Sequence, residues 1–313
     1  MLFNAPLLAA AFCLSTSPVL AAASPLADAL PMVGTGGHGH TYPGATVPFG
    51  FVQASPDTRN QGWDACSGYH YSDSTIMGFS HTHLSGTGCT ALGDLLIMPV
   101  TGDLNDPAGY QPLKAERFKS AFSHDNEVAQ PGYYRVLLDK YNVLAELTAT
   151  PHAAMHRYTF PASSHSHLLV DLVYGIGDHP TDAELTVAKN NLITGYRRVD
   201  GWAKGRMIYF AVETSKPFKD YGLEVDDQPL LARQADARGK NVRAHLDFKT
   251  SKGQQILLRV GLSPTSVEEA VKNLRAEIPS WDFDAVRAAA QISWSENLSR
   301  IQIESSNPDI RQT

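Results

Sequence analysis

The sequence contains little basic charge, few cysteines and no apolar run of membrane-spanning length. Its 313 residues carry 26 Lys and Arg against 32 Asp and Glu, a net charge of −6. This balance argues against a nucleic-acid partner, because nucleic-acid binding depends on a basic face. The apolar segment within residues 1–23 is too short and too interrupted to cross a bilayer as a helix. The three cysteines allow at most one disulfide.

Residues 1–23, MLFNAPLLAAAFCLSTSPVLAAA, are typical of a secretory signal peptide, although the usual positive residues are absent from this stretch. The segment predicts a secreted or periplasmic protein. Its cleavage removes Cys13 and leaves Cys66 and Cys89 in an oxidising compartment. A disulfide between these two closes a loop of about 24 residues and contributes roughly 3 kcal/mol. A pair of buried thiols is the alternative, and the residues leave both open.

Short runs rich in β-branched and aromatic side chains recur between residues 95 and 262, separated by turns of Gly, Pro, Asp and Asn. This pattern is typical of an antiparallel β-sandwich. There are too many runs for one small sandwich, so we expect two large sheets. The expected strands are 133–139, 143–150, 155–160, 167–173, 183–187, 192–198, 206–213, 243–247 and 255–260.

The pattern changes to helical after Gly261. Ser266 and Glu269 form a capping box, and apolar residues recur at helical spacing up to Pro279. A second helix is expected from about Asp282. Its expected buried stripe is Phe283, Val286, Ala290, Trp294, Leu298 and Ile301. Both stripes need a surface to pack on, in another domain or on the sandwich itself.

Residues 34–93 carry the candidate functional site. They hold five of the twelve His, two of the three Cys and Trp63, with Arg59 as the one basic residue. Gly and Pro are too frequent for a helix. The segment therefore predicts tight loops and short extended pieces, with many groups that hydrogen-bond neutral polar ligands.

Three chemistries compete for this segment. Gly34, Gly36 and Gly39 match G-x-G-x-x-G, but no strand precedes them and no helix follows, so a dinucleotide site is disfavoured. The pairs His38/His40 and His81/His83 have a spacing that would suit zinc, which keeps a His-ligated metalloenzyme open. A sugar site needs an apolar floor with a few placed polar groups. Four residues close in sequence supply such parts: Trp63, Asp64, His70 and His83.

The same segment resembles the start of glycoside hydrolase family 92, the calcium-dependent exo-α-mannosidases. The runs that carry the resemblance are GTGGHGHTYPGATVPFG, SPDTR, GWDACSGYHY and GFSHTHLSGTG. It continues through PGYY at 131–134, AELTAT at 145–150 and HRYTFP at 156–161. It covers most of residues 31–304.

The resemblance implies a domain organisation. We expect a mainly β, galactose-mutarotase-like antiparallel sandwich over residues 24–262, followed by C-terminal linker helices over 263–313. The helices would lead to an (α/α)6 catalytic barrel beyond residue 313. That barrel would hold the catalytic acid and base, and most ligands of the calcium. The implied activity is hydrolysis of terminal α-mannosides of N-glycans or mannans, by inversion.

The resemblance also implies the residues that contact the mannose-containing glycan. Trp63, Asp64 and Cys66 carry over with the most specific motif, and Gly36, Gly37, His38 and His83, with His81, carry over less firmly. No catalytic residue is assigned. Asp64, Asp73, Asp94 and Glu146 qualify only as carboxylates, and Glu146 lies in a strand pattern that favours a structural pair. A stand-alone carbohydrate-binding module is the main alternative function.

Overall fold

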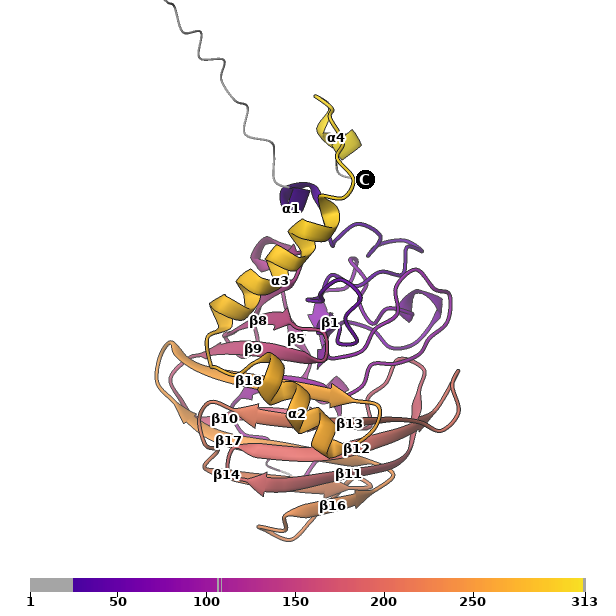
Figure 1. The fold of residues 1–313 in the computed structure, drawn as a ribbon. Helices are drawn as coiled ribbons and strands as arrows, with labels where there is room; N and C mark the ends of the chain where they lie inside the picture. The colour runs from indigo at the N-terminus through magenta and orange to yellow at the C-terminus, as the bar shows by residue number, and fades with distance from the viewer. Residues whose placement is uncertain (1–24, 106, 108, 312–313) are drawn as a thin grey trace, which may run out of the picture.

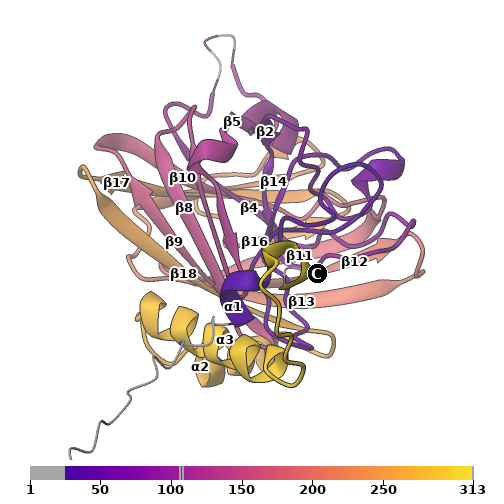
Figure 2. The ribbon, with the colours of Figure 1, turned by 90° about the horizontal axis from the view of Figure 1, so that it is seen from above.

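The computed structural model describes residues 25–105, 107 and 109–311. The expected signal peptide, with Cys13, lies outside the described residues. The described chain is mainly β, with two antiparallel sheets packed against each other and helices across one of them (Figures 1 and 2). The prediction of a large antiparallel sandwich followed by helices is confirmed. None of the helices in this part of the chain is long and apolar enough to span a membrane.

The seven-stranded sheet has the order β1-β3-β4-β10-β17-β14-β15. Its strands are β1 (Ser55–Asp57), β3 (Gly78–Ser80), β4 (Leu96–Thr101), β10 (Ser163–Asp171), β17 (Val242–Thr250), β14 (Asp220–Val225) and β15 (Gln228–Pro229). The expected strands 167–173 and 243–247 correspond to β10 and β17. The sequence did not predict β4, which contains Pro99, because a proline within an apolar run argues against a strand.

The nine-stranded sheet has the order β16-β11-β12-β13-β18-β9-β8-β7-β6. Its strands are β16 (Asp236–Gly239), β11 (His179–Lys189), β12 (Leu192–Asp200), β13 (Arg206–Thr214), β18 (Gln254–Ser263), β9 (Ala153–Phe160), β8 (Val143–Ala149), β7 (Tyr133–Leu138) and β6 (Val128–Gln130). All seven strands from β7 to β9, β11 to β13 and β18 were expected from the sequence.

Short elements connect the sheets. A two-stranded ladder joins β2 (Thr75–Ile76) to β5 (Ser120–Ala121). Single 3-10 turns form η1 (Trp63–Ala65), η2 (Ala115–Phe118) and η3 (His124–Asn126). The short helices α1 (Pro25–Asp28) and α4 (Pro308–Arg311) lie near the two ends of the described chain.

The core lies between the two sheets and follows the two-residue period of the strands. On β10, Leu168 and Val170 point into the core and pair in register with Leu246 and Ala244 of β17. His167, the residue before Leu168, points to the opposite, outer face of the seven-stranded sheet. The alternation thus places Leu168 and Val170 in the core and leaves His167 free for contacts on the other face.

Helices α2 (Val267–Glu277) and α3 (Phe283–Leu298) cover the outer face of the nine-stranded sheet (Figure 1). Ser266 caps α2 by accepting a hydrogen bond from the backbone N–H of Glu269 at 3.2 Å, as the capping box predicts. Leu274 of α2 packs on Leu192, and Phe283 of α3 packs in a cluster with Met155. The helices therefore dock on the sandwich itself.

The buried stripe predicted for the second helix is wrong at its last residue, Ile301. Ile301 lies three residues beyond the end of α3 and is 78% exposed. The helix ends near Ser299, so the helical spacing that placed Ile301 on the buried face no longer applies there. Trp294, by contrast, is held by a 2.6 Å hydrogen bond from its indole N–H to the carbonyl of Thr46.

A buried carboxylate ties the loops of residues 81–94 to the nine-stranded sheet. Asp94 accepts hydrogen bonds from Arg197 of β12 at 3.1 Å and Arg206 of β13 at 2.6 Å. Thr82 donates to the same carboxylate at 2.7 Å. Burial acts to raise the pKa of Asp94, but the two guanidinium groups outweigh it and lower the pKa below its ordinary value. Asp94 is therefore an ionised anchor.

Replacing Asp94 with Ala will destabilise the fold by about 3–5 kcal/mol, because Arg197 then stays buried without its carboxylate. Chemical denaturation followed by circular dichroism measures the loss. The matched control is Asp284→Ala, which removes an exposed carboxylate paired with Arg157 and costs at most about 1 kcal/mol. Equal losses in the two variants would contradict the anchoring role.

Candidate functional site

Residues 34–93 form a group of loops that includes β1, the edge strand of the seven-stranded sheet, and its neighbour β3 (Figure 1). Apart from those strands, their regular structure is the turn η1 and the two-residue strand β2. The prediction of short extended pieces and tight loops is confirmed. The loops bring three of the predicted sugar-contacting residues, Trp63, Asp64 and His38, to one exposed place.

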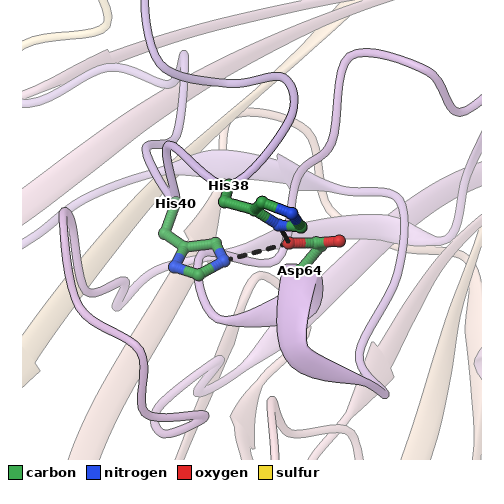
Figure 3. Close-up of side chains that lie close together, drawn as sticks. All are labelled: His38, His40 and Asp64. Atoms are coloured by element: carbon green, nitrogen blue, oxygen red, sulfur yellow. Dashed lines mark hydrogen bonds and ion pairs between the residues drawn. The ribbon is translucent and has the colours of Figure 1, made fainter.

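Asp64 joins two imidazoles from the glycine-rich loop (Figure 3). Its Oδ1 atom lies 2.6 Å from Nδ1 of His38 and 3.2 Å from Nε2 of His40. The hydrogen bond from His38, reinforced by that from His40, lowers the pKa of Asp64 below its ordinary range. The carboxylate is therefore ionised at neutral pH, and it is an acceptor only.

His40 is the fixed member of this cluster. Its side chain is buried, whereas 77% of the His38 side chain is exposed. The φ angle of His40 is +54°, a left-handed conformation that costs energy in a residue with a side chain. The carbonyl of His40 accepts a 2.7 Å hydrogen bond from Gly86. From the sequence, His40 was considered only as a zinc ligand, because of its spacing from His38. Its role in holding Asp64 was not predicted.

Trp63 presents an apolar surface beside the cluster. Its indole is 60% exposed and meets the ring of His40 edge-on at 5.1 Å between centroids. The backbone of Gly88 lies against the indole, because a Cβ atom at Gly88 would come within 2.2 Å of Cη2 of Trp63. Gly88, which the sequence gave no reason to choose, therefore supports the position of Trp63.

Cys66 supports the same turn from below. Its thiol is buried and donates a 2.8 Å hydrogen bond to the carbonyl of Trp63. Burial raises the pKa of this thiol. Cys89 is exposed, and both cysteines are free in the structure. The sequence left open a disulfide or a pair of buried thiols. The structure has two free thiols, of which only Cys66 is buried.

The glycine-rich loop at Gly36 and Gly37 is exposed and held from one side. The ring of His70 donates from Nε2 to the carbonyl of Gly37 at 3.1 Å, while its Nδ1 contacts the hydroxyl of Ser72 at 2.8 Å. His70 thus fixes the loop that carries His38. Gly36 and Gly37 themselves stay exposed to solvent.

His81 and His83 lie beneath the site and serve the scaffold. His83 contacts the carbonyl of Gln53 and the buried carboxylate of Asp57, each at 2.9 Å, and its side chain has no exposed surface. His81 donates to the carbonyl of Leu95 at 2.7 Å and lies 2.9 Å from His156. Burial lowers the pKa of His81 to about 4.

The zinc site considered for the two His pairs is therefore not formed. His81 and His83 are bound to different buried partners and lie outside the group of His38, His40 and Asp64. The contacts that separate them come from residues distant in the sequence, such as His156, which the spacing of the pair does not reveal.

The other carboxylates considered from the sequence make structural pairs. Glu146 binds Arg157 through both oxygens, at 2.6 and 2.7 Å, as its strand pattern favoured. Asp73 binds Arg59 and accepts from Thr58 at 2.7 Å. Among Asp64, Asp73, Asp94 and Glu146, Asp64 alone receives its hydrogen bonds only from imidazoles. Both of them end on Oδ1, and no described residue donates to Oδ2.

The site lies at an open surface. A cavity of about 340 Å³ is lined by Asn60 and Gln61, which precede Trp63 in the sequence, and extends to Arg243. A second, of about 290 Å³, lies between Tyr42 and Trp294. Neither of these cavities is lined by Trp63, Asp64 or His38.

Comparison with known proteins identifies the family. The model of the glycosyl hydrolase family 92 N-terminal domain matches residues 30–263. This chain belongs to glycoside hydrolase family 92. The model of the family 92 catalytic domain matches residues 269–313, which contain most of α2 and all of α3.

Relatives of this family 92 chain include a curated protein and solved structures. An uncharacterized secreted glycosidase of Arthroderma benhamiae is 31% identical over 88% of this chain and 38% of its own length. A family 92 α-mannosidase of Bacteroides thetaiotaomicron, solved in complex with mannoimidazole, is 34% identical with a TM-score of 0.86, covering 93% of this chain and 39% of that one.

An inverting mannosidase of the same bacterium and family is 26% identical, with a TM-score of 0.78, covering 92% of this chain and 38% of that one. The family 92 chain described here thus spans about two fifths of the length of these relatives.

In this family 92 chain, Cys89 will react with a thiol reagent such as Ellman's reagent and Cys66 will not, because Cys66 is buried with a raised pKa. In a Cys13→Ser background, we expect about one fast thiol in the folded protein and a second only after denaturation. Cys89→Ser should abolish the fast reaction. No reaction before a reductant is added would instead show a disulfide.

Proposed function

We propose that this chain acts as the N-terminal domain of an α-mannosidase and supplies part of its mannose pocket. The observation that carries the proposal is the juxtaposition of the exposed indole of Trp63 with the ionised carboxylate of Asp64, in a family 92 domain. An apolar platform and a fixed acceptor side by side are what a hexose site requires. Membership of the family makes mannose the proposed sugar.

Each group has a distinct role in binding. The indole of Trp63 would stack on the C–H face of the sugar and exclude water from it. Both imidazoles bind Oδ1 of Asp64, and no hydrogen bond from the described residues occupies Oδ2. That oxygen is therefore free to accept a hydrogen bond from a sugar hydroxyl. His38 and His40 hold the carboxylate of Asp64 in one orientation. Little side-chain entropy is therefore lost when the sugar binds.

The hydrolytic step is assigned to another part of the enzyme. Inversion needs an acid and a base on opposite sides of the glycosidic bond, with their carboxyl groups roughly 6.5–9.5 Å apart to admit a water molecule. Asp73, Asp94 and Glu146 are all tied into ion pairs. We therefore assign the acid and base to the catalytic domain, whose model begins to match at residue 269.

Calcium, which family 92 implies, does not fit the metal-binding groups of this domain. Calcium takes six to eight oxygen ligands. The two groups of His, Cys, Asp and Glu found in the described residues each combine two imidazoles with one carboxylate. We assign calcium to the catalytic domain, and no step performed by this chain depends on it.

We further propose that the enzyme acts outside the cytoplasm on terminal α-mannosides of N-glycans or mannans. The signal-peptide pattern of residues 1–23 supports this location. The relative from Arthroderma benhamiae is named as a secreted glycosidase, which agrees with it.

In an enzyme that joins this chain to its catalytic domain, Trp63→Ala and Asp64→Asn will each lower kcat/KM for an aryl α-mannoside. A hydrogen bond to a charged group contributes about 1.5–3 kcal/mol, so we expect a loss of roughly 10–150-fold for Asp64→Asn. The matched control is Trp202→Ala, because Trp202 is also exposed but lies outside the loops of residues 34–93. It should leave kcat/KM unchanged.

Three results would count against the proposal. The first is a loss of the same size in Trp63→Ala and Trp202→Ala. The second is robust mannoside hydrolysis by residues 1–313 alone, which we expect to have no measurable activity. The third is mannose binding by residues 1–313 alone that is as tight as in the joined enzyme, which would favour a stand-alone carbohydrate-binding module.

A further inference from the structure

A second cluster of imidazoles and a carboxylate lies on the outer face of the seven-stranded sheet. Strand β10 supplies His167, and the neighbouring strand β17 supplies His245 and Asp247. His167 and Asp247 are direct partners in the ladder between the two strands. His245 and Asp247 are two residues apart, so the strand period places them on the same face. None of the three belongs to the loops of the sugar site.

The three side chains converge on one oxygen atom. Oδ1 of Asp247 lies 2.7 Å from Nδ1 of His167 and 2.7 Å from Nδ1 of His245. The three atoms all lie within 4.8 Å of one another. His167 is almost fully buried, whereas His245 and Asp247 are each about a quarter exposed. The cluster is thus closed on the side of the sheet and open on the side of solvent.

The hydrogen bonds of His167 point to a cation at this position. Its Nε2 lies 3.0 Å from the carbonyl oxygen of Gly102, which can only accept, so Nε2 must carry a proton. A neutral His167 therefore directs the lone pair of Nδ1 at Asp247, whose ionised carboxylate is also only an acceptor. A positive charge must lie between the two, either a second proton or a metal ion.

The contact with Gly102 is also the one that a metal-binding histidine makes. Such histidines almost always donate the N–H of the second ring nitrogen to a carboxylate, a backbone carbonyl or water, which fixes the ring and its tautomer. In His167 this outer contact is already in place, and it leaves Nδ1 aimed at the open side of the cluster.

The neighbouring strand β14 fixes the other imidazole. Gly222 pairs with His245 in the ladder, and a Cβ atom at Gly222 would lie 2.2 Å from Nε2 of His245. The ring of His245 therefore occupies the space that glycine leaves open. Three paired strands hold the cluster, so little conformational freedom would be lost when a ligand binds.

We propose that His167, His245 and Asp247 bind a divalent transition-metal ion, with zinc as the best match. Two imidazole nitrogens and one carboxylate oxygen, with a water as fourth ligand, form a common tetrahedral zinc site. Zinc bonds of about 2.0–2.1 Å put neighbouring ligand atoms about 3.3 Å apart. Each 2.7 Å contact would lengthen by roughly 0.6 Å, which side-chain rotation can supply.

The bound ion would cross-link β10 to β17 and, through His167, hold the loop that starts at Gly102. This role is structural and independent of mannoside hydrolysis. The cluster of His38, His40 and Asp64 has the same set of ligand atoms, but its two imidazoles come from a glycine-rich loop and His38 is largely exposed. It belongs to the sugar site, and it serves here as the internal control.

The test is zinc binding to the purified protein after dialysis against a chelator, measured by isothermal titration calorimetry and by the zinc-induced rise in Tm. Wild type should bind about one zinc tightly and gain stability. His245→Gln should lower the affinity by more than the roughly 10–100-fold that loss of a second-shell partner causes, and should lose the rise in Tm. His38→Gln, in the control cluster, should behave as wild type in both measurements.

A second variant keeps the test decisive if His245→Gln alters the fold. Asp247→Asn keeps the size of the side chain, and circular dichroism without zinc reports whether either variant folds. Loss of zinc binding in Asp247→Asn with an unchanged spectrum supports the site. Absence of zinc binding in wild type, or binding that survives in both variants and disappears in His38→Gln, overturns it.

Discussion

The buried ion pairs of Asp94 are the interaction on which the functional loops depend. One carboxylate holds Arg197 and Arg206 from two adjacent strands, and Thr82 closes the loop back onto it. The loop between Thr82 and Asp94 contains Gly88, the residue against which Trp63 rests. Because a buried charge without its partner is costly, this part of the loop region has one stable position, although it has few strands of its own.

Histidines show how environment decides the role of a residue type. His81 and His156 are buried, and burial lowers the pKa of each, so they act as neutral hydrogen-bonding groups of the core. His38 and His40 meet a partly exposed carboxylate, and His38 is itself largely exposed. His167 and His245 stand on paired strands and meet in a rigid cluster. The residue type is the same in all three cases, and the surroundings differ.

The openness of the proposed sugar site agrees with the proposal that this domain shares its pocket with another. Trp63 is exposed and Asp64 is partly exposed, and neither residue lines the cavity at Asn60 or the cavity at Tyr42. Helices α2 and α3 already cover the outer face of the nine-stranded sheet. The exposed part of the loops is thus the surface on which the proposed pocket would be completed.

Local patterns in the sequence determined the strands from β7 to β13 and the starts of α2 and α3, because alternation and capping act within a few residues. The motif around Trp63 and Asp64 likewise predicted the residues of the proposed sugar site. The tertiary structure alone decided that His83 lies buried on Asp57, that Gly88 supports Trp63, and that His167 meets His245 and Asp247. These contacts join residues about 25 to 80 positions apart, and they depend on strand register and loop path, which no local pattern encodes.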